Sequence, residues 1–175
     1  MKEKLLKKIL KDKGALDKLI SLFIKRKLLF KRNSDKFEIL GHMEKAKHNL
    51  SFIGDTKKIE YPDWIVIGCY YAVYHSVLSL ILSKGYFSKN HDASLSVLIK
   101  EFYEDFVSTF DFINILFIDY NDITFYVHKR EKREFASYSS SFVFSKDEIK
   151  KIINQTVNFV NKAEEILKIW KLKNY

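Results

Sequence analysis

One stretch of the chain, residues 61–85, is almost free of charge and constrains the fold more than any other. Its sequence is YPDWIVIGCYYAVYHSVLSLILSKG, in which Pro62 and Asp63 favour the first turn of a helix and Gly85 favours a helix end. About six helical turns fit between them, and such a helix is apolar around most of its circumference. We therefore predict a helix that lies in the middle of a bundle.

A membrane-spanning helix is the alternative interpretation, because the apolar length approaches the ~20 residues that cross a bilayer. His75 and three tyrosines lie in the middle of this stretch. Hydrocarbon would offer these polar groups no hydrogen-bond partner. We therefore predict a core helix in a cytoplasmic protein and no contact with a membrane.

The composition favours long helices. Five glycines and one proline in 175 residues leave little material for hairpin turns. The single cysteine, Cys69, excludes an internal disulfide framework and fits a reducing cytosol. The start MKEKLLKK lacks the apolar region of a signal peptide. Hydrophobic periodicity and capping residues predict an all-α, up-and-down bundle of five or six helices, which cover about residues 2–32, 35–53, 62–84, 92–109, 111–134 and 146–170.

The basic charge lies at the N-terminus. Residues 1–32 hold 12 Lys and Arg against three acidic residues, so they account for the whole net charge of +9. Apolar residues follow a helical stripe between these lysines. We predict a basic amphipathic extension over residues 1–32 and a helical bundle over residues 33–175. Three interpretations of this extension stay open. It could pack on the bundle or on a second subunit, it could bind RNA as an electrostatic arm, or it could lie on a membrane surface.

The sequence predicts no metal site and no cofactor. No two of the five histidines form an HxxxH pair, and Cys69 has no second cysteine with which to bind zinc. Glycine-rich phosphate loops, GxSxG and HExxH motifs are absent from the sequence. Because Cys69 lies in the most apolar helix, we expect an inert core residue and not a nucleophile.

Two histidines and one polar segment are the candidates for chemistry. His75 shares a helical face with Tyr71. The pair either forms a hydrogen-bonded polar island between helices or belongs to a site that a residue from another helix completes. His91 starts a helix, where capping or exposure explains it. In residues 126–138, Arg130 and Arg133 lie about one turn apart and could hold a phosphodiester, with His128 and Tyr138 in reach. The alternative is a solvated helix end with ion pairs.

Several short patterns follow one another along residues 34–170. They are Ala46 with His48-Asn49-Leu50, then Asp63-Trp64, then the core Tyr70-Tyr71-Ala72-Val73-Tyr74-His75, then Gly85 and His91, and last an "R…A-x-Y" pattern between Arg130 and Tyr138. In this order and spacing the set resembles the HEPN domain, a helical module of prokaryotic nucleotide-related and toxin proteins. The resemblance implies an up-and-down bundle, commonly a homodimer whose equivalent helices meet at a two-fold cleft.

The resemblance also implies a reaction, because many HEPN proteins are metal-independent ribonucleases. In those, an R-x4-6-H motif places Arg on the scissile phosphate and His as acid and base for attack by the 2′-hydroxyl. This chain departs from the motif, since Tyr138 stands where the His after Arg133 would be and His128 precedes both arginines. A tyrosine with a pKa of ~10 is a poor general base at neutral pH.

We therefore predict a non-catalytic HEPN-like homodimer that binds a nucleotide, RNA or a partner protein, such as a nucleotidyltransferase-type subunit. The alternative is a divergent ribonuclease or a toxin of a toxin–antitoxin pair. In it, Arg130 and Arg133 would hold phosphate while His128, His75 or Tyr138 moves protons. A third hypothesis is an assembly module that uses residues 1–32 as its interaction helix.

Overall fold

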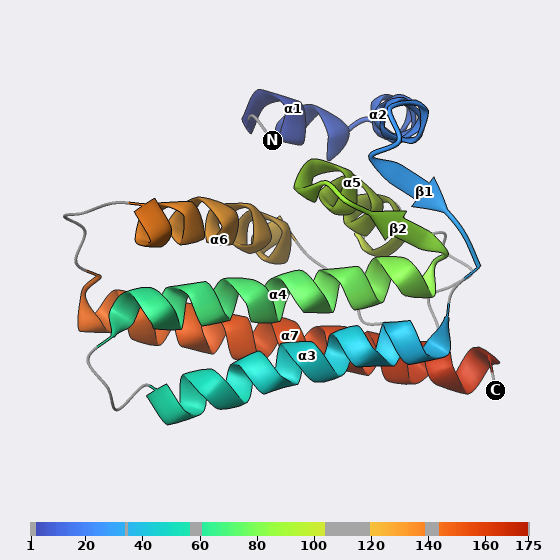
Figure 1. Ribbon diagram of the computed structural model, residues 1–175. Helices are drawn as coiled ribbons and strands as arrows, with labels where there is room; N and C mark the ends of the chain where they lie inside the picture. Colours follow the sequence, from blue (N-terminus) through green and yellow to red (C-terminus); the bar gives the residue numbers. More distant parts are fainter. Residues whose placement is uncertain (1–2, 34, 57–60, 104–119, 139–143, 175) are drawn as a thin grey trace.

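The computed structural model describes residues 3–33, 35–56, 61–103, 120–138 and 144–174 (Figure 1). Within these ranges the chain forms seven helices and two short strands, which confirms the prediction of an all-α bundle. In chain order they are α1 (Glu3–Ile9), α2 (Lys13–Lys25), β1 (Leu29–Lys31), α3 (Lys36–Thr56), α4 (Pro62–Ser83), β2 (Tyr86–Ser88), α5 (His91–Phe102), α6 (Tyr120–Tyr138) and α7 (Lys146–Asn174).

Helix α4 lies at the centre of the fold, as the sequence predicts. It packs against α3, α5, α6 and α7. Its length and composition would also suit a membrane span, but 83% of its most apolar window is buried inside the fold. The helix therefore behaves as the core of a bundle, in which neighbouring helices supply the apolar surroundings.

One face of α4 is only partly covered by its neighbours. The side chain of Trp64 is 59% exposed and that of Tyr71 is 41% exposed. These residues are seven apart, so they lie on the same face about two turns from each other. The spacing in the sequence places both residues on one helical face, but it does not show which face stays exposed, because α4 is apolar in nearly every direction.

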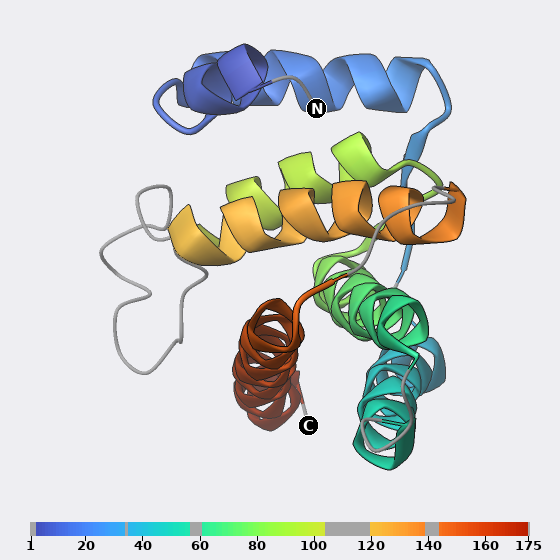
Figure 2. The same cartoon turned by 90° about the vertical axis from the view of Figure 1, so that its left-hand side faces the viewer.

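The helices form layers around α4. Helices α3, α4 and α7 lie side by side, whereas α5 and α6 pack on the other side of α4 (Figures 1 and 2). Helices α1 and α2 lie beyond α5, and α2 runs across the direction of the long helices, since Figure 1 shows it end-on and Figure 2 shows it lengthwise. This arrangement brings residues of α3, α5 and α6 to the surface of α4.

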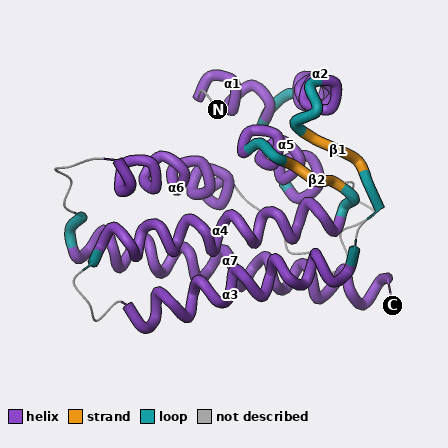
Figure 3. The backbone as a smooth tube through the Cα atoms, in the orientation of Figure 1, coloured by secondary structure: helices purple, strands orange, loops and turns teal. Residues whose placement is uncertain are grey.

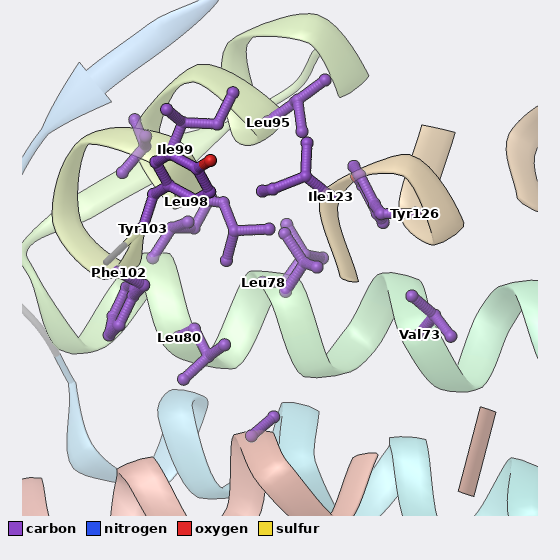
Figure 4. Packing of buried hydrophobic residues seen from close by; sticks show 14 of the residues in the cluster. Val73, Leu78, Leu80, Leu95, Leu98, Ile99, Phe102, Tyr103, Ile123 and Tyr126 are labelled. Carbon is purple, nitrogen blue, oxygen red and sulfur yellow. The ribbon is translucent and has the colours of Figure 1, made fainter. Parts of the chain in front are cut away.

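Apolar side chains from α4, α5 and α6 fill the space between these helices (Figure 4). Leu98 and Ile99 of α5 are fully buried, as are Leu80 of α4 and Ile123 of α6. Fully burying a side chain of this kind stabilises the fold by about 1.5 to 3 kcal/mol relative to leaving it in water. This core fixes the start of α5 beside α4, where His91 lies.

The two strands were not predicted from the sequence, which indicated a helix up to residue 32 and a plain turn after Gly85. Strand β1 pairs antiparallel with β2, with Phe30 opposite Phe87 (Figure 3). Two residues in the left-handed region redirect the chain, Lys27 with φ 55° and Gly85 with φ 75°. The Arg32 N–H donates to the Gly85 carbonyl at 3.0 Å, which extends the pairing by one bond.

The N-terminal helices pack on the bundle. Leu6, Ile9, Leu16 and Ile20 belong to the same buried cluster as α4 and α5. Helix α2 packs on α5, and the Lys100 ammonium lies 2.6 Å from the carboxylate of Asp17 on α2. The prediction that the N-terminal extension packs on the bundle is thus confirmed for α1 and α2. The division of the chain at residue 32 stays a prediction.

Local capping predictions are confirmed at two helix starts. The Ser145 N–H donates to the Glu148 carboxylate at 3.1 Å, and the Glu148 N–H donates to Ser145 Oγ at 3.2 Å. Asn90 Oδ1 accepts from the backbone N–H groups of Asp92 and Ala93. The start of the helix predicted from residue 111 and most of the serine-rich loop at 137–141 lie outside the described residues.

Candidate functional site

Arg133 of α6 lies on the ring of Tyr70 of α4. The guanidinium carbon is 5.1 Å from the ring centroid, a cation–π distance. The Arg133 Nε is buried and, within the described part of the chain, has no hydrogen-bond partner. A planar cation that is held in place and keeps an unused donor is suited to an oxyanion such as phosphate.

The hydroxyl of Tyr70 reaches a histidine at the start of α5. Tyr70 Oη lies 3.0 Å from His91 Nε2, and Tyr70 itself is buried. Tyr74, one turn further along α4, stacks on Tyr70 with centroids 5.8 Å apart and lies 5.1 Å from the His91 ring. Arg133, Tyr70 and His91 thus form a continuous line across α6, α4 and α5.

From the sequence, capping or exposure explains His91, and neither a catalytic nor a phosphate-binding role is assigned to it. The signal that could have found it was its place in the resemblance, after Gly85 and at the beginning of a helix. The contact of His91 with Tyr70 depends on how α5 packs against α4, and this packing cannot be predicted from the sequence.

His75 pairs with a histidine from another helix. His42 Nδ1 of α3 lies 2.9 Å from His75 Nδ1, and the two rings stack with centroids 5.1 Å apart. Burial, with smaller contributions from His42 and Lys45, lowers the pKa of His75 to about 4. Burial also lowers the pKa of His42, an effect that Glu38 opposes and that Lys45 and Arg32 reinforce. One nitrogen must donate and the other accept, so at least one ring is neutral.

Three tyrosines connect the two histidine sites along α4. The ring of Tyr74 lies 5.5 Å from His75, and that of Tyr71 lies 5.1 Å from Tyr70. Burial, with a smaller contribution from Tyr71, raises the pKa of Tyr74. Residues Tyr70, Tyr71, Tyr74 and His75 are called the aromatic ridge below. Arg133 and His91 border one side of the ridge, and His42 borders the other.

The structure does not bring all predicted site residues together. His128 is exposed and lines a groove of about 340 Å³ between α6 and α7, together with Lys132 and Lys151. Arg133 is five residues further along α6, roughly 140° around the helix, and faces Tyr70 instead. The side chains of Arg130 and Tyr138 lie outside the described residues. Of the predicted residues, Arg133 and His75 therefore border or belong to the ridge, and His128 does not.

Within the described residues, no group of three or more His, Cys, Asp or Glu side chains could hold a metal ion. Cys69 is fully buried in α4. The pairing of His42 with His75 supplies only two nitrogen ligands, and Glu38, one turn before His42 in α3, pairs with Arg32. The chemistry open to the ridge is therefore that of a guanidinium, imidazoles and phenols.

Comparisons with known proteins agree with the order of the sequence patterns. A family model described as the HEPN domain matches residues 39–167. A protein of Methanocaldococcus jannaschii that carries the name "Putative toxin" is 26% identical over 143 residues, which are 80% of this chain and 85% of that protein. The matched family region includes the ridge, Arg133, His91 and His42, and it excludes α1 and α2.

Proposed function

We propose, because this chain belongs to the HEPN domain family, that it binds RNA and that Arg133 holds an RNA phosphate. The observation that carries this proposal is the guanidinium of Arg133 on the Tyr70 ring, 5.1 Å from its centroid. The cation–π contact orients the guanidinium plane before any ligand arrives. Less side-chain entropy is then lost when a phosphate oxygen binds.

The aromatic ridge favours RNA over an isolated phosphate. Tyr71 is 41% exposed beside Tyr70, so part of its ring is available for contact with a base. Stacking of a base on an aromatic side chain contributes about 1 to 3 kcal/mol and tolerates any sequence. A phosphate on Arg133 and a base on Tyr71 would together hold one or two nucleotides of a single strand.

We also propose that the protein is a homodimer. Phe52 of α3, Tyr61 and Trp64 of α4 are 39%, 60% and 59% exposed. They lie at one end of the α3–α4 pair, since a Cβ on Gly68 would be 3.2 Å from the Phe52 ring, and Trp64 is one turn before Gly68. These three residues are called the aromatic patch. Clusters of large exposed rings mark protein interfaces, and because the family resemblance implies a homodimer, we assign the aromatic patch to its interface.

Fluorescence anisotropy with a labelled single-stranded RNA tests the binding proposal. Arg133→Ala is expected to lower the affinity at least tenfold, because it removes both the charge and the oriented donors. Arg133→Lys keeps the charge and should recover only part of the affinity. Arg26→Ala, at an exposed position that follows α2, is the matched control. Equal affinity of Arg133→Ala and wild type would contradict the proposal.

A second candidate function is RNA cleavage, and the position of His91 favours it. His91 accepts or donates a hydrogen bond at the Tyr70 hydroxyl, and the Tyr70 ring makes the cation–π contact with Arg133. A base in this place would take the proton of a 2′-hydroxyl, whose oxygen attacks phosphorus while the 5′-oxygen leaves with a proton. The products are a 2′,3′-cyclic phosphate and a 5′-hydroxyl end. The similar protein named as a toxin supports this candidate.

Incubation of end-labelled RNA with the protein in EDTA tests cleavage. His91→Ala should abolish cleavage and keep most of the RNA affinity, because Arg133 is unchanged. His128→Ala should cleave at the wild-type rate, since His128 lies in the groove between α6 and α7. RNA that stays intact with the wild-type protein would leave binding alone as the function of this site.

A further inference from the structure

Helices α1 and α2 leave a groove between them with an aliphatic floor. The groove has a volume of about 370 Å³, and Leu5, Leu19 and Leu22 line it. Leu5 is 38% exposed and Leu22 is 39% exposed. The opposite face of the same helices is already used, since Leu16 and Ile20 are buried in the core. Leu19 is partly buried and packs against the core, whereas Leu5 and Leu22 keep more than a third of their surface open to a ligand.

The rim of this groove is basic. Lys8 and Lys18 line it, and both are exposed. The two described acidic side chains of this region are engaged, Asp12 as the cap that accepts from the Ala15 N–H at 2.9 Å and Asp17 in the ion pair with Lys100. Residues 3–25, which form α1, α2 and their connection, hold seven lysines against three acidic residues. A ligand of this groove thus meets leucines together with Lys8, Lys18 and the carboxylate of Asp12, so the charged lining carries two cations against one anion.

We propose that this groove binds an acidic amphipathic helix of a partner protein. A helix with two or three apolar residues at three- and four-residue steps fills a groove of this size, and flanking carboxylates meet the lysines. RNA fits poorly, because the groove lining contains neither an aromatic ring nor an arginine for stacking. A membrane also fits poorly, because a concave floor cannot contact a flat bilayer. The groove lies outside the region that matches the family.

A synthetic helical peptide with leucines on one face and glutamates on the other is the probe. Its binding to the full-length protein is followed by anisotropy of an attached fluorophore. We expect saturable binding in the micromolar range that weakens as salt screens the charge pairs. A peptide with the same leucines and lysines in place of glutamates should bind at least tenfold more weakly, because like charges repel at the rim.

Matched variants locate the binding site. Leu22→Ser and Lys18→Glu are each expected to weaken peptide binding at least fivefold. Ile24→Ser and Lys25→Glu change equally exposed positions of the same helix outside the groove, and they should bind as wild type. All four positions are on the surface, so circular dichroism should show folded variants. Arg133→Ala should also bind the peptide as wild type, which separates this proposal from the RNA site.

Three outcomes would overturn the proposal. The first is absence of saturable binding by the acidic peptide. The second is equal weakening by Leu22→Ser and Ile24→Ser, which would place the peptide elsewhere. The third is binding of anionic vesicles or RNA that depends on Lys18 while the acidic peptide does not compete, which would assign the groove to another class of ligand.

Discussion

His42 and His75 face each other across α3 and α4, with 2.9 Å between their Nδ1 atoms. The residues are 33 positions apart in the chain, and only the packing of the two helices brings them together. The contact needs a donor and an acceptor, so it holds while at least one ring is neutral. Protonation of both rings would place two cations side by side in a half-buried site, which also faces Lys45, Arg32, Glu38, Tyr71 and Tyr74.

Stability should therefore fall as the pH falls from about 7 to 4. The pKa of His75 is about 4 in the folded chain, below the ordinary histidine value of 6.5. The unfolded state then binds more protons between these two values, so acid favours unfolding. We expect a loss on the order of 1 kcal/mol after allowance for solvent screening. Urea titrations at several pH values measure it.

His75→Gln should flatten this pH dependence, because glutamine does not titrate. His128→Gln is the matched control, since His128 is exposed on α6. It should keep the wild-type dependence. A dependence that survives unchanged in His75→Gln would assign the effect to other groups.

Two substitutions at Tyr70 should separate its ring from its hydroxyl. Tyr70→Phe keeps the ring under Arg133 and removes the bond to His91, so RNA affinity should change less than twofold. Tyr70→Leu removes the cation–π contact, worth about 0.5 to 2 kcal/mol, and should weaken RNA binding several-fold. Anisotropy titrations compare the two. A larger loss of RNA affinity in Tyr70→Phe than in Tyr70→Leu would contradict the assigned role of the ring.

The aromatic patch should decide the oligomeric state. Trp64→Glu places a charge at the centre of the proposed interface, so the dimer is expected to dissociate. Light scattering coupled to size exclusion gives the mass directly. Val157→Glu, on α7 and 36% exposed, is the control and should stay dimeric. A wild-type protein that is monomeric at micromolar concentration would contradict the dimer.

Gly85→Ala should destabilise the connection between α4 and β2. Gly85 has φ 75°, and a Cβ there would lie 3.2 Å from the Arg32 carbonyl oxygen. We expect a loss of about 1 to 2 kcal/mol in the free energy of unfolding. Gly41→Ala, within α3 and with nothing within 4 Å of the added Cβ, should instead stabilise the protein by up to about 1 kcal/mol. Urea unfolding of both variants measures the contrast, and equal effects would contradict it.

The sequence predicted the features that arise from neighbouring residues. The central helix from Pro62, the turn at Gly85 and the cap formed by Ser145 and Glu148 each depend on residues a few positions apart. Such signals are contained in the order of the residues themselves. They were enough to establish the all-α fold and the order of most helices.

Features that depend on packing between distant segments were missed. Strand β1 has three residues, too few for a periodic signal, and it forms only because β2 lies beside it. The exposure of Trp64 and the contact of His91 with Tyr70 depend on which helices cover α4. The separation of His128 from Arg133 follows from the face of α6 that meets α4. An apolar helix does not reveal from its own sequence which face stays open.

The binding of an RNA phosphate by Arg133 is tested most directly by the salt dependence of RNA affinity. If Arg133 contacts one phosphate, Arg133→Ala should lower the affinity and reduce the slope of log K against log salt by about 0.7. Arg26→Ala should leave the affinity and the slope close to wild type. An unchanged slope in Arg133→Ala, together with a reduced slope in Arg26→Ala, would contradict the proposed site and assign RNA binding to the basic N-terminal helices.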